Sequence, residues 1–297
     1  MQHSLGPRGG LAGSLHARAA RSLRRLRRGG LPHGLAARSL AGSLAAGGSV
    51  ACLASAAPGG SGNSSSGPRP SARDLAFGSE LRRVTDSLLV LHGLVYVLDW
   101  ASKGTLMLLG AKVNALVAAG QWWRLLSCNF LHIGLIHLAV NSATLANIGP
   151  HAELLAGSRR FSAVYLAGGL AGAAASFLLT PGPSMGASGA LFGLGAALGV
   201  FYWRHRDIFG RRSESVLQQL GVCLAINVAF AATQKGIDGW GHIGGLLGGA
   251  VASWLLGPNM VREGGRFVDR PPLPLLAFKG NERRGGEGGL GLKPLPS

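Results

Sequence analysis

The sequence is poor in charged residues. Asp, Glu, Lys and Arg make up 14% of its 297 positions, whereas a soluble domain usually carries about 25% charged residues. The chain instead has 49 glycines, 47% hydrophobic residues and a positive mean hydropathy of +0.28. This balance argues against an ordinary soluble domain and indicates a membrane protein.

Acidic residues are missing altogether from the first 73 positions, which contain ten arginines. These arginines account for more than half of the net charge of +17, so the basicity belongs to one leader segment and not to a nucleic-acid surface. Phe, Trp and Tyr are also absent before Phe77, so the leader offers bases no aromatic platform on which to stack. We therefore expect no nucleic-acid partner.

The leader, residues 1–73, is rich in Arg, Ser, Gly, Ala and Leu and ends in a Gly-, Ser- and Pro-rich run at 58–70. This composition is typical of an organellar transit peptide followed by a linker. A permanently disordered basic arm is the alternative interpretation of the same residues.

Cysteine is also scarce. Cys52, Cys128 and Cys223 lie far apart, so they predict neither a disulfide framework nor a set of metal ligands. We interpret them as small apolar packing residues and expect no metal and no other cofactor.

Long apolar runs fill the middle of the chain. Six of them have about the 20-residue length that a bilayer requires, and they predict spanning helices over 84–100, 130–149, 161–179, 186–203, 216–233 and 240–256. The expected fold is therefore an all-α membrane protein with one six-helix domain over 80–257. The Gly- and Pro-rich residues 258–297 predict a flexible tail.

Two parts of this domain are less regular. The first run contains Asp86, His92 and Asp99, so we expect that helix to be tilted or partly interfacial. The segment 104–120 is apolar but is interrupted by Lys112 and Asn114, which predicts a loop lying in the membrane interface.

The basic residues predict an orientation, because cytoplasmic-side loops of membrane proteins carry more Lys and Arg. With the first helix starting inside, four basic residues flank the outer ends: Lys103, Lys112, Arg124 and Lys235. Eleven flank the inner ends: Arg82, Arg83, Arg159, Arg160, Arg204, Arg206, Arg211, Arg212, Arg262, Arg266 and Arg270. Both ends of the domain are thus predicted to lie inside, and the second, fourth and sixth helices to start from the outer face.

This topology brings polar groups from three helices to one depth. Ser188 stands near the start of the fourth helix, between Gly186 and Gly189. Glycines let another backbone approach a hydroxyl, and amides at a helix start have no partner within the helix, so they are free to donate to a developing oxyanion. In a membrane helix the same glycines also suit plain helix packing.

His242 stands near the start of the sixth helix and can take a proton from a serine hydroxyl. Gly241 and Gly245 have the small-xxx-small spacing that brings helices together, so packing and catalysis are compatible interpretations here. Asp238 lies one turn before His242. We expect a dyad of Ser188 and His242, with Asp238 a bystander.

His137 and Asn141 are four residues apart and share one helical face of the second helix. An uncharged amide with two N–H donors suits an oxyanion site, although a purely structural role for the pair remains open. His132, also placed in the first half of this helix, is turned somewhat away from that face.

These motifs, in this order over residues 80–260, resemble those of the rhomboid intramembrane serine proteases. The matching residues are Trp123-Arg124, His132 with His137 and Asn141, Gly186-x-Ser188-Gly189, and Gly241-His242. The resemblance implies a Ser188–His242 dyad and an oxyanion site made by the His137 and Asn141 side chains and the Ser188 amide. It implies a structural role for Trp123 and Arg124 and an aromatic ring at Phe192 stacked on His242, where ordinary packing is the alternative.

The family resemblance implies a membrane protein substrate with a transmembrane segment, cleaved within the lipid bilayer. The segment 266–272, Arg-Phe-Val-Asp-Arg-Pro-Pro, is similar to plant plastid rhomboids, which favours the chloroplast inner envelope over the mitochondrial inner membrane. An inactive rhomboid-fold binding or quality-control factor is a competing hypothesis, although such relatives usually lack the serine or the histidine. A small transporter is disfavoured because the sequence shows no inverted repeat and no matching broken helices.

Overall fold

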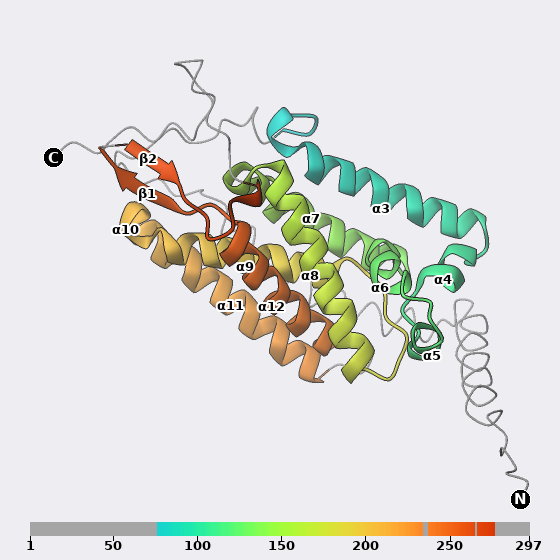
Figure 1. Cartoon of the computed structure of the whole chain (residues 1–297). Helices are drawn as coiled ribbons and strands as arrows, with labels where there is room; N and C mark the ends of the chain where they lie inside the picture. The colour runs from blue at the N-terminus through green and yellow to red at the C-terminus, as the bar shows by residue number, and fades with distance from the viewer. Residues whose placement is uncertain (1–75, 234–236, 265, 277–297) are drawn as a thin grey trace, which may run out of the picture.

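The computed structural model describes residues 76–233, 237–264 and 266–276 (Figure 1). The expected transit peptide, Cys52 and the end of the expected tail lie outside these residues. Ten α-helices are seen in the described part of the chain: α3 Arg83–Ala101, α4 Thr105–Gly110, α5 Asn114–Ala118, α6 Arg124–Ser127, α7 Leu135–Ala156, α8 Ser158–Leu179, α9 Ser188–Arg204, α10 Arg206–Phe209, α11 Arg211–Thr233 and α12 Gly239–Leu256. The remaining elements there are the 3-10 turns η1 Glu80–Arg82, η2 Cys128–Phe130 and η3 Pro274–Leu276, and strands β1 Met260–Glu263 and β2 Arg266–Asp269.

Six of these helices are long, with 17 to 23 residues: α3, α7, α8, α9, α11 and α12. Among the described residues, two segments are long and apolar enough to cross a membrane by themselves, Glu80–Ala101 and Ser158–Leu179. A third is added if the bent pair Arg124–Phe130 and Leu135–Ala156 counts as one span. The fold is thus mostly helical and membrane-type, as the sequence predicts.

The second predicted helix was placed too early. Residues 131–134 interrupt it, and α7 begins only at Leu135, at 88° to the segment Arg124–Phe130. Leu131 and Gly134 both adopt extended backbone conformations, so the helix cannot run through them. His132 therefore lies in the interruption and not on the helix with His137, which corrects its predicted place. The segment 104–120 is likewise not a plain loop, because it holds α4 and α5.

The polar residues of α3 point into the protein. Asp86 pairs with Arg82 (2.7 Å), the Asp99 carboxylate accepts a hydrogen bond from the Met107 amide (2.8 Å), and all three of Asp86, His92 and Asp99 are buried. The start of α3 is fastened by Glu153 of α7, whose carboxylate accepts hydrogen bonds from the amides of residues 84 and 85. Because burial with partners offsets the cost of polar groups in a membrane helix, these residues do not exclude a span.

Small residues bring α8, α9 and α12 together at the centre of the bundle (Figure 1). A Cβ atom added at Gly245 of α12 would overlap the backbone of Gly189 in α9, and one at Gly249 would overlap Gly193. At Gly172 of α8 an added Cβ would lie only 2.6 Å from the Gly241 carbonyl oxygen. The three backbones are therefore nearly in contact, as small-xxx-small spacing permits.

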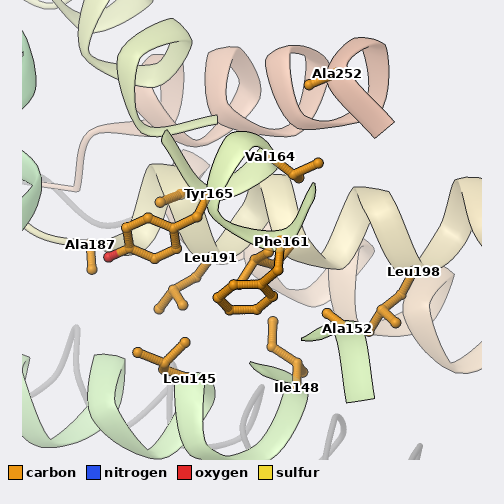
Figure 2. Packing of buried hydrophobic residues seen from close by; sticks show 12 residues of the cluster. Leu145, Ile148, Ala152, Phe161, Val164, Tyr165, Ala187, Leu191, Leu198 and Ala252 are labelled. Atoms are coloured by element: carbon orange, nitrogen blue, oxygen red, sulfur yellow. The ribbon is translucent and has the colours of Figure 1, made fainter. Parts of the chain in front are cut away.

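The apolar core lies beside this contact and joins α7 to α8 and α9 (Figure 2). Leu145 and Ile148 of α7 face Phe161 and Tyr165 of α8, and Leu191 of α9 closes the cluster (Figure 2). All five side chains are at most 5% exposed. The helix that carries Ser188 is consequently packed on two sides.

The expectation of a flexible tail from residue 258 was wrong for residues 260–276, which contain β1, β2 and η3. β1 and β2 form an antiparallel hairpin at one end of the bundle (Figure 1). Asp269 pairs with the buried Arg160 of α8 (2.6 Å), and the Met260 amide donates to Nε2 of His205 (2.8 Å). A Gly- and Pro-rich composition did not reveal these long-range partners.

The glycine contact leads to a paired stability prediction. Gly249→Ala should destabilise the protein by about 1–3 kcal/mol, because the new methyl group is forced into the Gly193 backbone. Gly195→Ala in α9 is the matched control, because a Cβ atom there meets nothing within 4 Å and alanine favours the helix by about 0.5–1 kcal/mol. Thermal unfolding in detergent measures both. Equal midpoints for the two variants would show that the α9–α12 contact is not tight.

Candidate active site

Ser188 is the first residue of α9, so its amide belongs to a first turn whose N–H groups have no acceptor within the helix. Gly189 follows and makes the backbone contact with Gly245 of α12. Gly245 lies on α12, less than one helical turn beyond His242. The close helix contact therefore lies immediately next to both polar side chains.

The His242 ring faces Ser188 directly. Its Nε2 atom lies 3.0 Å from the Ser188 Oγ atom, which is hydrogen-bonding distance. Both residues are half-buried, so the pair is largely shielded but not sealed off. A hydroxyl hydrogen-bonded to an imidazole is the arrangement in which a base activates a serine.

Phe192 supports the imidazole by stacking on it. Its ring lies 4.5 Å from the His242 ring, centroid to centroid, at an interplanar angle of 15°. Ser188 and Phe192 are one turn apart on α9, so one helix supplies both the hydroxyl and the ring that fixes the imidazole. The stacking expected from the family resemblance is present in the structure.

Gly186 lets α7 approach the serine. It has a φ of +125°, and a Cβ atom there would lie 2.6 Å from Cε1 of His137. Any larger residue would be strained in this conformation and would push the imidazole away. His137 is thereby held against the backbone two residues before Ser188.

Asn141 follows one turn later on α7 and is buried. Its side-chain amide donates one hydrogen bond to the His137 carbonyl oxygen (2.9 Å), and an amide has a second N–H to offer. His132, from the interruption before α7, contacts the His137 ring edge-on, with centroids 5.2 Å apart. Its ring also contacts that of His92 in α3, with centroids 5.1 Å apart.

Trp123 and Arg124 fasten the segment between α3 and α7. The buried Arg124 guanidinium donates to the carbonyl oxygens of Ala111 (2.8 Å) and Leu108 (3.0 Å), and the exposed Trp123 indole donates to that of Leu109 (3.2 Å). Both act on the backbone, which fits the structural role that the resemblance implies.

Asp238 has a structural role, and among the described contacts its side chain does not touch the His242 ring. It is the N-cap of α12, and its Oδ1 atom accepts a hydrogen bond from the Gly241 amide (2.9 Å). An Asp directly before an apolar helical run is an N-cap signal, so the sequence could have assigned it this role. A small apolar cavity lined by Phe161, Leu194 and Ser253 lies elsewhere in the core and includes none of the site residues.

Comparison with known proteins matches residues 119–259 to the Rhomboid domain family. The chain is 45% identical to "Rhomboid protease GluP" of Bacillus subtilis over 174 residues, which cover 58% of this chain and 34% of that relative. It is 34% identical to "Putative rhomboid protease YdcA" of the same bacterium over 145 residues, which cover 48% of this chain and 71% of that relative.

A plant relative also matches. "RHOMBOID-like protein 9, chloroplastic" of Arabidopsis thaliana is 32% identical over 152 residues, which cover 51% of this chain and 35% of that relative. The chain thus spans about one third of the length of GluP and of the plant protein.

Proposed function

Because the chain belongs to the rhomboid family, we propose that it is an intramembrane serine endopeptidase that uses a Ser188–His242 dyad. The observation that carries this proposal is the 3.0 Å contact between Ser188 Oγ and His242 Nε2. Its substrates are membrane proteins, which are cleaved at a transmembrane segment within the bilayer.

In the proposed reaction, His242 takes the proton of Ser188 as the hydroxyl oxygen attacks the scissile carbonyl. The protonated imidazole then gives that proton to the leaving amine, and water releases the acyl group from the serine in the reverse sequence. Phe192 keeps the imidazole facing Oγ throughout. The family has catalytically inactive members, so a rhomboid-fold binding factor is the alternative, and the presence of both Ser188 and His242 disfavours it.

The oxyanion that forms during attack needs donors. We assign this role to the Ser188 amide, the His137 ring and the Asn141 side chain. The support for His137 is its contact with Gly186, two residues from the nucleophile. The support for Asn141 is its place on the same face with an N–H group to spare.

The proposed membrane topology has six spans, formed by α3, α7, α8, α9, α11 and α12, with both ends of the domain on the inner side. Their lengths of 17 to 23 residues suit a bilayer core of about 30 Å.

The dyad gives the first functional prediction. Ser188→Ala and His242→Ala should each abolish cleavage of a single-span membrane substrate by the reconstituted protein, and the double variant should be little worse, because the two residues act as one unit. Thermal unfolding checks that each variant is folded. Substantial cleavage by either folded single variant would remove the dyad from the mechanism.

A second prediction separates oxyanion binding from folding. Loss of one oxyanion donor lowers kcat by about 10²–10³-fold where few donors share the charge. We expect about tenfold for Asn141→Ala, because two donors remain, and a larger loss for the His137→Ala/Asn141→Ala double variant. Turnover is compared with the thermal midpoint of each variant. A folded double variant with unchanged turnover would leave only the Ser188 amide in this role.

The proposed location is the chloroplast inner envelope, with the mitochondrial inner membrane as the alternative. The acid-free leader supports import into an organelle, and one plant relative is named chloroplastic. A fusion of residues 1–73 to a fluorescent protein should therefore accumulate in plastids of plant cells. Fluorescence in mitochondria would favour the alternative, and cytosolic fluorescence would contradict a transit peptide.

A further inference from the structure

A fully buried lysine lies outside the dyad. Lys112 stands between α4 and α5, outside the spanning helices, and is 0% exposed. Its ammonium group has four acceptors, three of which are backbone carbonyl oxygens at 2.8 to 3.2 Å. The fourth is Oδ1 of Asn114 (2.9 Å). A buried charge is costly unless it is paired and hydrogen-bonded, so this lysine has a specific structural environment.

The three carbonyl groups belong to Ser176, Thr180 and Gly182. The first two are at the C-terminal end of α8, where carbonyl groups carry partial negative charge, and the Ser176 carbonyl oxygen also accepts from the Thr180 amide (2.9 Å). Gly182 lies in the segment 180–187, which leads from α8 to Ser188. Lys112 thus holds the end of α8 and the segment before the nucleophile at once.

The backbone of Lys112 adds to this hold. Its amide donates to the Ser184 carbonyl oxygen and its carbonyl oxygen accepts from the Ser184 amide, both at 3.0 Å. The Gly186 amide donates to the Cys128 carbonyl oxygen (2.9 Å). The segment before Ser188 is therefore fastened at every second residue: Gly182, Ser184 and Gly186.

An opposite charge lies on the other side of the same residues. Thr180 Oγ1 donates to Oδ1 of Asp238 (2.8 Å), and Ser176 Oγ donates to Oδ2. Ser176 and Thr180 thus each give a carbonyl oxygen to Lys112 and a hydroxyl to Asp238. Since Asp238 caps the helix that carries His242, the two shared residues connect the support of Ser188 to the support of His242.

We propose that Lys112 and Asp238 are positioning residues, which together hold the segment before Ser188 and the start of α12 so that the nucleophile and its base stay in reach. Lys112 must be protonated to do this, because a neutral amine has only two N–H donors for its four acceptors and no charge to offer the end of α8. The proposal rests on the proteolytic function proposed above.

The charges of the pair support this requirement. Burial lowers the pKa of Lys112 to about 8, while the negative charge of Asp238 opposes that shift. Cys128 is the other titratable group that faces Lys112. Burial raises the pKa of Asp238, but hydrogen bonds from Ser176, Ser184, Thr180 and the Gly241 amide outweigh it, so the pKa lies below its ordinary value and the carboxylate stays charged.

The decisive variant is Asp238→Asn, because asparagine is as good an N-cap as aspartate. It keeps one acceptor oxygen for the Gly241 amide and Thr180, while it removes the charge and replaces the oxygen that accepts from Ser176 with an NH2 donor. For the wild type, kcat should fall as the pH rises through about 8, where Lys112 loses its proton. In Asp238→Asn this fall should begin roughly one pH unit lower, because a neighbouring charge that favours protonated Lys112 is gone. Asp207→Asn, at an exposed site on α10, should leave the profile of kcat against pH unchanged.

Lys112→Met should lower kcat by up to about 10²-fold through misplacement of the nucleophile, with a smaller change in KM. Lys103→Met is the matched control, since Lys103 is exposed. If Lys112→Met does not fold, the profile of kcat against pH for Asp238→Asn still tests the proposal. An Asp238→Asn profile that coincides with that of the wild type, or a wild-type kcat that does not fall up to pH 9.5, would overturn the proposal.

Hydrogen–deuterium exchange at pH 7 tests the positioning role of Lys112 and Asp238 without relying on protease activity. Asp238→Asn should raise amide exchange in both 182–186 and 239–243, relative to the wild type and to Asp207→Asn. If the wild type cleaves no substrate, the proteolytic function fails, and the exchange result alone decides whether the pair couples the two segments. A rise confined to 239–243 would show an ordinary helix cap and would overturn the coupling.

Discussion

The backbone contact between Gly189 of α9 and Gly245 of α12 is the constraint on which the site depends. Helices in a membrane gain little from the hydrophobic effect when they associate, so close approach of small residues has to supply the packing. Here the contact lies one residue from Ser188 and three residues from His242. It therefore sets the separation of Oγ and Nε2, which is 3.0 Å, and Gly172 of α8 closes the same contact from a third side.

Everything irregular around this contact is fastened by buried polar groups. The segment between α3 and α7 is held by Arg124, the start of α3 by Glu153, and the segment before Ser188 by Lys112. Each of these side chains meets at least one backbone group that has no partner within a helix. In a bilayer such groups cost several kcal/mol when unsatisfied, so a non-helical backbone near the site is possible only with these partners. Close-packed helices and fastened segments together hold Ser188 and His242 at hydrogen-bonding distance.

Much of this arrangement is readable from the sequence, because it rests on periodicity and spacing. Apolar runs reveal the long helices, and glycines four residues apart around His242 reveal a close helix contact. Other features depend on contacts between distant residues and leave no local pattern. The interruption before α7 takes His132 off that helix, and it became evident only from the extended backbone at Gly134 in the structure. The hairpin beyond α12 is held by the ion pair of Asp269 with Arg160. The sequence does not reveal this pair, because the two residues are more than 100 positions apart. Lys112 looked like one more flanking charge, because nothing nearby in sequence shows that its acceptors lie at the end of α8.

The most direct test of the account is covalent labelling of Ser188 in the membrane-reconstituted protein. A fluorophosphonate reacts with a serine only where a base activates the hydroxyl, and mass spectrometry of the labelled protein locates the adduct. The account predicts a single adduct on Ser188 in the wild type, and its loss in His242→Ala while the protein stays folded. Absence of the adduct in the wild type, or equal labelling without His242, would contradict the claim that the contact of α9 with α12 creates an activated serine.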